Sequence, residues 1–192
     1  MVGCRVRLFF WLILPMCIGG VGFSWAGSPR YTFYDEARLL EVLGPNLLKL
    51  KLVKRDKVVV VRLIGVGSPR NRDRVRGLKS EVVSYIDSNR IWESSADFVR
   101  SLLSDKVIEL WTRRWDRFDE KNRLLAYVMI PTASEGSVDL NGEIIRKGLG
   151  FVTRDYVHVT FVHYRELEEE ARNNRRGIWG GLSIGTISSL SK

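Results

Sequence analysis

The chain has 192 residues, 45% of them hydrophobic, and carries a formal net charge of +9 at pH 7. This length and composition fit a single compact domain and exclude a low-complexity chain. The basic balance favours a polyanionic partner such as nucleic acid, or an anionic lipid surface, although solubility alone also accounts for it.

The first 26 residues have the pattern of an export signal. Arg5 and Arg7 form a basic start, residues 8–21 are an apolar run, and Ser24-Trp25-Ala26 ends in the small-x-small pattern of a cleavage site. An uncleaved membrane anchor is the alternative, but the run is short for a span and is interrupted by Pro15. The pattern therefore predicts an exported protein, periplasmic or secreted.

Removal of this segment simplifies the chemistry of the remaining chain. Both cysteines, Cys4 and Cys17, lie within it, so the mature chain is expected to hold neither a disulfide framework nor a thiolate metal site. Loss of its two arginines lowers the formal charge from +9 to +7, which is still clearly basic.

A β-hairpin is the first element that the pattern predicts in the mature chain. Residues 48–52 alternate apolar and polar side chains with a period of two, a polar turn follows at 54–57, and 58–61 is a second apolar run. This hairpin places Arg62 near the end of its second strand.

The later elements alternate between strands and helices. In chain order they are a helix from Ser94 or Ser95 to about Leu103, strands over 107–111 and 124–130, a helix from Asp139 to Gly148, and a helix from about Tyr164 to Asn174. Either Ser94 or Ser95, and Asp139, can cap their helices because their side chains can accept from free backbone N–H groups. A domain over 27–182 and a loose polar tail over 183–192 follow from this order.

Four segments resemble the motifs of one known family. They are Val61-Arg62-Leu63-Ile64-Gly65-Val66-Gly67-Ser68-Pro69-Arg70, then Asp116-Arg117-Phe118 with residues 122–128, then residues 139–150, then Arg175-Arg176-Gly177-Ile178-Trp179. In this order they are similar to R-L-x-G-[IV]-D-T-P-E, D-[RK]-Y-G-R-x-L-A-Y-V, N-x-x-L-[IV]-x-x-G-L-A and K-x-G-I-W of the staphylococcal nuclease-like (thermonuclease) family. The resemblance implies an α+β fold, a five-stranded OB-fold β-barrel with about three packed helices.

The resemblance also implies two phosphate-binding residues. The family hydrolyses phosphodiesters with calcium held by aspartates, a glutamate that handles the water, and two arginines on the phosphate. Arg62 and Arg123 match the two arginines, and their planar guanidinium groups suit a phosphate.

The family's acids do not carry over. Gly67 stands at the aspartate position and Arg70 at the glutamate position of the first motif. The family's earlier D-G-D-T segment falls at residues 43–47, which hold neither aspartate, although Asn46 offers one neutral oxygen. Without these carboxylates no metal site and no cofactor is assigned, and calcium belongs only to the alternative of an active enzyme.

A run of cations follows the first motif. It consists of Arg70, Arg72, Arg74, Arg76 and Lys79, against the single acid Asp73. A loop of this charge that faces the cleft binds phosphates, whereas the alternative is a solvated mobile loop.

Two other groups are weaker candidates. Asp119 to Lys121 read as a three-residue insertion after Asp116-Arg117-Phe118. The acids Asp116, Asp119 and Glu120 supply either a rebuilt metal site or a charged hairpin tip. Trp111, Trp115 and Phe118 can stack on bases, although their spacing along a strand places at least one of them in the core.

Three functions remain. The first is an exported, catalytically impaired nucleic-acid or polyanion binder that uses Arg62, Arg123 and the arginine-rich loop. The second is a calcium-dependent nuclease with carboxylates from elsewhere, such as Asp73, Glu81 or Asp87. The third is a protein-interaction module of the cell envelope. No stable membrane span is expected once the signal is cleaved.

Overall fold

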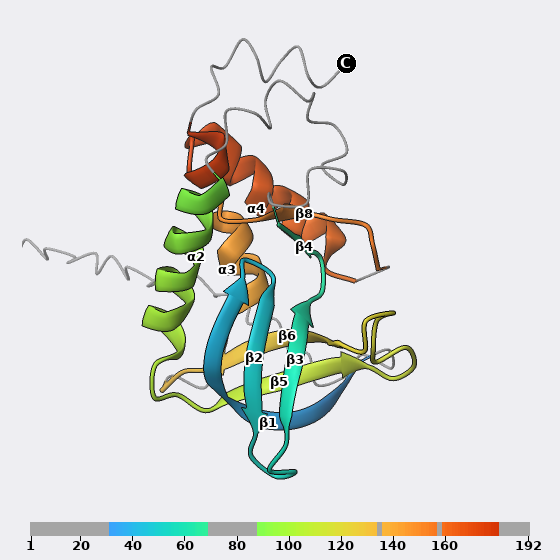
Figure 1. Cartoon of the computed structure of the whole chain (residues 1–192). Coiled ribbons are helices and arrows are strands. Elements are labelled where there is room, and N and C mark those ends of the chain that lie inside the picture. Colours follow the sequence, from blue (N-terminus) through green and yellow to red (C-terminus); the bar gives the residue numbers. More distant parts are fainter. Residues whose placement is uncertain (1–30, 69–87, 134–135, 157–158, 181–192) are drawn as a thin grey trace, which may run out of the picture.

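A computed structural model of the chain describes residues 31–68, 88–133, 136–156 and 159–180 (Figure 1). The predicted export signal, the arginine-rich loop with its acids Asp73, Glu81 and Asp87, and the C-terminal tail lie outside the described residues. Among the helices in the described ranges, none is long and apolar enough to cross a bilayer.

Five strands form a closed ring of hydrogen bonds. They are β1 (Tyr31–Gly44), β2 (Leu47–Leu52), β3 (Val58–Leu63), β5 (Ile108–Arg113) and β6 (Leu124–Pro131). β1 pairs with β2 and β5, β2 with β3, and β5 with β6, all antiparallel, and β3 closes the ring by pairing with β6 in parallel. A ring of this kind removes the exposed edges of a sheet, and it confirms the predicted OB-type barrel.

The β2–β3 hairpin has the predicted register. Leu48, Leu50 and Leu52 are fully buried in the barrel, and the lysines between them point outward. Arg62 lies one residue before the end of β3 and pairs in register with Leu47 of β2 on one side and Leu125 of β6 on the other. The barrel therefore fixes the backbone of Arg62 from both sides.

The longest strand, β1, was not predicted. Its register shifts at three places, between Phe33 and Asp35, between Leu39 and Glu41, and between Val42 and Gly44. Each bulge inserts a residue and resets the inward and outward alternation, so the period of two that identifies a strand is interrupted. The bulges also let one strand curve around the barrel to reach both β2 and β5.

Three α-helices pack around the barrel in the described part of the chain. They are α2 (Ser88–Leu103), α3 (Leu140–Arg146) and α4 (Phe161–Asn173), and Figure 1 shows them gathered along one side and one end of the strands. A short 3-10 helix, η2 (Gly177–Trp179), buries Trp179 completely, with Arg172 of α4 4.0 Å above its ring. The core therefore continues from the barrel interior to the helices.

Two predicted helix starts are wrong. α2 begins at Ser88, and Ser95 is not a cap but a buried residue within the helix. Ile91, Ser95, Val99 and Leu103 form a buried stripe at four-residue spacing, so the face that packs begins before the two serines. α4 begins at Phe161, three residues before the predicted start at Tyr164.

The α3 cap is confirmed. The side chain of Asp139 accepts from the backbone N–H of Asn141, as expected of an N-cap residue. The buried Asn141 in turn donates from Nδ2 to the carbonyls of Ile64 and Ala126, and its Oδ1 accepts from the backbone N–H of Val128. These bonds join α3 to the strands that carry the site.

Two short strand pairs complete the described fold. β7 (Ser137–Asp139) pairs with β6, and β4 (Val66–Gly67) pairs with β8 (Phe151–Val152) in a separate two-stranded sheet. β4 directly follows β3, and β8 follows α3, so this pairing brings residue 67 beside residue 151 (Figure 1).

Candidate functional site

A pocket of about 310 Å³ lies at one end of the barrel. Its lining residues are Leu43, Gly44, Pro45, Asn46, Leu47, Arg62, Gly67, Ser68, Trp92, Arg123, Phe151, Thr153 and Asp155. These come from the β1–β2 turn, β3, β4, α2, the start of β6, and β8 with the segment after it. The pocket therefore gathers residues that lie far apart in the sequence, between residues 43 and 155.

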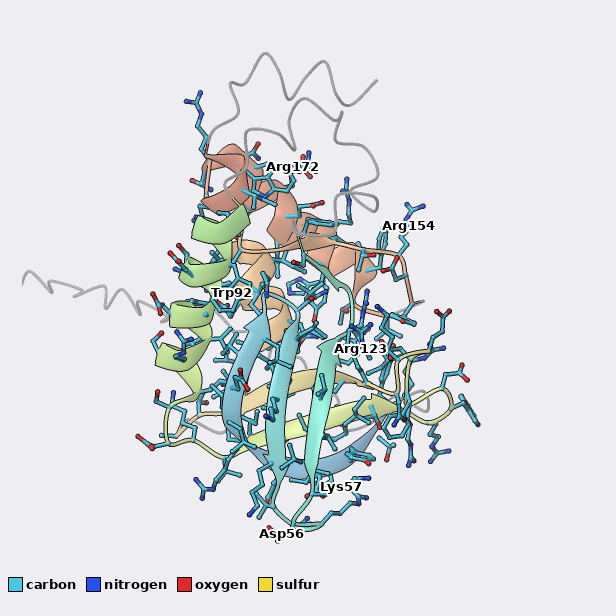
Figure 2. All side chains as sticks on the ribbon, viewed as in Figure 1. Asp56, Lys57, Trp92, Arg123, Arg154 and Arg172 are labelled. Carbon is cyan, nitrogen blue, oxygen red and sulfur yellow. The ribbon has the colours of Figure 1, made fainter. Side chains whose placement is uncertain are left out.

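The structure brings Arg62 and Arg123 together in this pocket. Arg62 is on β3, and Arg123 directly precedes β6, the parallel neighbour of β3. Figure 2 shows Arg123 beside β3 and Trp92 of α2 on the other side of the β1–β2 turn. Two guanidinium groups on one pocket wall form a candidate anion site.

Arg62 is buried and bonded to a carboxylate that the sequence analysis did not single out. Its Nη2 donates to Oδ2 of Asp155 at 2.9 Å, and its guanidinium lies 5.5 Å from the ring centre of Tyr156. Asp155 is 93 residues away along the chain, so nothing in the local pattern around Arg62 indicates the contact. The pocket thus holds a negative charge beside one of its two arginines.

Arg123 is held by Asp119. Oδ2 of Asp119 lies 2.7 Å from Nε and 2.5 Å from Nη2 of Arg123, and its Oδ1 accepts the backbone N–H groups of Arg123 and Lys121. Burial of the Asp119 side chain, which is 2% exposed, opposes its charge, but the bonds from Arg123 hold the pKa of Asp119 below its ordinary value. Asp119 is therefore an ionised anchor that orients Arg123.

This contact corrects the alignment of the second motif. The family pattern places an aspartate four residues before the arginine, and Asp119 occupies that place, whereas Asp116 makes only a 3.7 Å contact with Arg113. Asn122 has a φ of +56°, the conformation for which the pattern uses glycine. Asp119 to Lys121 are therefore part of the motif and not an insertion, and Asp119 is engaged with Arg123.

The place of the family's aspartate is filled by an aromatic ring. Gly67 pairs with Phe151 across the β4–β8 ladder, and both are buried. A Cβ on Gly67 would come to 2.6 Å from Cζ and 2.8 Å from Cδ2 of Phe151, and closer still to Cε2. Real Cβ atoms do not approach ring carbons this closely, so the phenyl ring uses the space that any side chain at residue 67 requires.

Asn46 has a structural role. Its Nδ2 donates to the backbone carbonyl of Val66 at 2.9 Å, and the backbone carbonyl of Asn46 accepts the backbone N–H of Leu63. These bonds hold the β1–β2 turn against β4, beside Pro45 in the pocket wall.

The described lining residues do not fit a calcium ion. Calcium takes about six to eight hard oxygen ligands, with carboxylates prominent among them. Asp155 is the only carboxylate that the described residues contribute to the pocket lining, and Arg62 is bonded to it. No group of three or more His, Cys, Asp or Glu side chains suited to a metal is found in the described ranges.

The remaining candidates are dispersed. Trp111 is partly buried against the core, whereas Trp115 and Phe118 are exposed on the β5–β6 loop. Arg70, Arg72, Arg74, Arg76 and Lys79 lie outside the described residues. Trp92, which the sequence analysis missed, lines the pocket and donates from Nε1 to the carbonyl of Leu43 at 3.3 Å.

Comparison with protein-family models gives one finding that bears on this site. The model described as staphylococcal nuclease homologue (SNase) matches residues 60–181, from within β3 to just past η2. The matched span includes Arg62, Gly67, Asp119, Arg123 and Phe151. No curated protein matches the sequence.

Proposed function

Because the chain belongs to the staphylococcal nuclease homologue family, whose function is nuclease-like and related to nucleic acid, we propose that it is a catalytically impaired nucleic-acid or polyanion binder. Arg62 and Arg123 are the proposed phosphate ligands at the pocket. The cationic run from Arg70 to Lys79 is proposed to extend the same anion-binding surface.

The observation that carries the proposal is the packing of Phe151 against Gly67. The family's aspartate position is not only without a carboxylate but also without room for one, because the ring lies where a Cβ would be. Loss of a hard oxygen ligand removes both charge and geometry from a calcium site. The two arginines depend on no such ligand, so anion binding can persist where metal-assisted hydrolysis does not.

The arrangement of the arginines supports anion binding. A guanidinium carries several N–H donors in one plane. Asp119 engages Arg123 through Nε and Nη2, and Asp155 engages Arg62 through Nη2, so each guanidinium has further donors with which to bind a phosphate. Contacts of this kind recognise the backbone and not the base, so affinity is expected to depend on salt and little on sequence.

A second candidate function rests on Asp155. Its carboxylate lines the pocket at a place where it can meet a bound phosphate or an ion, and it suits the alternative of a calcium-dependent nuclease with rearranged carboxylates. Against this, its bond to Arg62 places a cation where a metal ion would compete. One substitution separates the two functions.

Asp155→Asn is expected to tighten binding of single-stranded DNA about fivefold at low salt. The amide oxygen still accepts from Arg62, but the negative charge that opposes an incoming phosphate is gone, and a charge at this range contributes about 1 kcal/mol. Fluorescence anisotropy of a labelled oligonucleotide measures the change.

Asp97→Asn on α2 is the matched control, because it changes the net charge equally at an exposed ion pair with Arg100 that is not part of the pocket lining. Affinity that rises equally in both variants would reflect net charge alone and would contradict the pocket proposal. If Asp155 ligates a catalytic ion, Asp155→Asn instead abolishes calcium-stimulated cleavage without tightening binding.

The organisation of the chain is also proposed. We infer that residues 1–26 direct export to the periplasm or the exterior, that the binding domain spans 27–182, and that 183–192 form a tail. The basic start, the apolar run and the small-x-small ending support the export signal. N-terminal sequencing of the protein recovered from its native compartment tests the cleavage site.

A further inference from the structure

The β5–β6 loop exposes two aromatic rings among cations. Trp115 is 65% exposed and Phe118 is 46% exposed. They are the two aromatic residues among the large hydrophobic residues that the described part of the chain exposes. Arg113, Arg114 and Arg117 lie in the same short stretch, with Asp116 as the acid between them. Large rings left in water are unusual without a partner, and their cationic neighbours indicate that the partner is an anion.

The backbone at Phe118 and at the residues that follow it is firmly held. The buried Asp119 carboxylate accepts two backbone N–H groups of the loop and binds the Arg123 side chain. Phe118 forms a β-bridge with Leu124, and the carbonyl of Arg117 accepts the backbone N–H of Leu125. The loop is therefore tied from Arg117 onward, which fixes the backbone of Phe118 and lowers the entropy lost when a ligand binds. Trp115 lies two residues before this tied part.

A second cationic and aromatic cluster adjoins the loop. Arg55 of the β2–β3 turn and Arg117 of the loop lie 4.2 Å and 5.8 Å from the ring centre of Tyr34 in β1. Beside it, Lys54 lies 4.9 Å from the ring centre of Phe33. Oδ2 of the buried Asp35 fixes Arg55 at 3.0 Å. Arg117 thus joins this cluster to the loop that carries the two exposed rings. We name the cluster and the two rings together, Phe33, Tyr34, Lys54, Arg55, Trp115, Arg117 and Phe118, the basic aromatic face.

We propose that the basic aromatic face is a second nucleic-acid-binding surface, specific for single strands, in which bases stack on Trp115 and Phe118. Stacking is sequence-tolerant because every base has an aromatic face, but only an unpaired base is free to use it. The cations around the rings match the phosphates that accompany each base. In a duplex the bases are already stacked on one another, so they are not available to stack on Trp115 and Phe118.

This inference rests on the proposed function, because the loop leads directly from the face to the pocket. Arg117 and Phe118 are in the face, Asp119 is the anchor, and Arg123 lines the pocket, all within seven consecutive residues. One strand that enters the pocket with a phosphate on Arg62 and Arg123 therefore continues onto the rings. The face gives the pocket a preference for single strands that phosphate contacts alone do not supply.

The test compares the parent with the Trp115→Ala/Phe118→Ala double variant. The affinity for a labelled single-stranded oligodeoxythymidine is expected to fall roughly 10- to 100-fold, and that for a duplex of equal length by less than about twofold. The slope of log affinity against log salt is expected to stay the same, because no cation is removed. Val162→Ala on α4, which removes apolar surface from a residue that is 69% exposed, is the control and is expected to change neither affinity.

The other outcomes would contradict the stacking proposal. Equal losses for single strand and duplex, or no loss for either, would overturn the stacking role. Binding of phosphatidylserine vesicles that the double variant loses while it keeps the single strand would assign the face to a lipid surface instead. If the double variant binds as the parent does but removal of the pocket arginines weakens binding, the face fails and the proposed function stands; if the parent binds no nucleic acid, both fail.

Discussion

Gly67→Asp is expected to lower the free energy of unfolding by about 3 to 4 kcal/mol, and not to create a nuclease. The new Cβ would lie within 3 Å of three carbons of the Phe151 ring, so the ring or the β4–β8 ladder must shift. The carboxylate would also be buried, and the two cations of the pocket, Arg62 and Arg123, are already paired with Asp155 and Asp119. Guanidinium unfolding followed by tryptophan fluorescence measures the loss.

Two further variants isolate the cause. Gly67→Ala keeps the steric clash and omits the charge, so it is expected to show about half or more of the loss. In a Phe151→Ala background, which is itself expected to cost about 3 kcal/mol, the clash is gone and only the buried charge remains, so Gly67→Asp should cost less than about 2 kcal/mol more. A Gly67→Asp protein as stable as the parent, and newly stimulated by calcium, would show that Phe151 does not exclude a side chain there.

Removal of the two pocket arginines is expected to weaken binding of single-stranded DNA by at least roughly 100-fold at low salt, since each charge-assisted contact contributes about 1.5 to 3 kcal/mol. The slope of log affinity against log salt should fall by about 1.4, because two phosphate contacts to a single strand are lost. Arg123→Gln alone would leave Asp119 charged and buried, so it is paired with Asp119→Asn and combined with Arg62→Gln.

Lysine provides the matched control. Arg62→Lys/Arg123→Lys keeps both charges but loses the planar fork, so it should keep most of the salt slope and lose less affinity than the glutamine variant. Unfolding curves of each variant show whether the fold is intact. If the folded glutamine variant binds with wild-type affinity, the pocket arginines do not bind the phosphates.

The barrel was readable from the sequence where its strands are regular. The β2–β3 hairpin shows a clean period of two, and the parallel closure onto β6 then follows from the fold that the motifs imply. The sequence does not predict β1 because its bulges interrupt that period. The predicted start of α2 lies too far along the chain because Ser94 and Ser95 have the side chains of cap residues, although Ser95 packs inward. Local patterns therefore fail where tertiary packing outweighs them.

The candidate site was readable only in part, for a related reason. Arg62 and Arg123 were found because each belongs to a local motif. Asp155 and Trp92 join the pocket through contacts between distant segments, which no spacing in the sequence reports. The sequence shows that Gly67 stands where the family has an aspartate. It does not show that the Phe151 ring occupies the space of a side chain at residue 67, because that contact depends on the pairing of β4 with β8.

Incubation of the purified protein with labelled DNA and RNA, with calcium and with a chelator, decides between a binding protein and an active nuclease. We expect salt-dependent binding that the chelator leaves unchanged, with no calcium-stimulated cleavage of any substrate. Robust cleavage that requires calcium and disappears with the chelator would contradict this expectation, and would show that carboxylates from elsewhere in the chain have rebuilt a metal site.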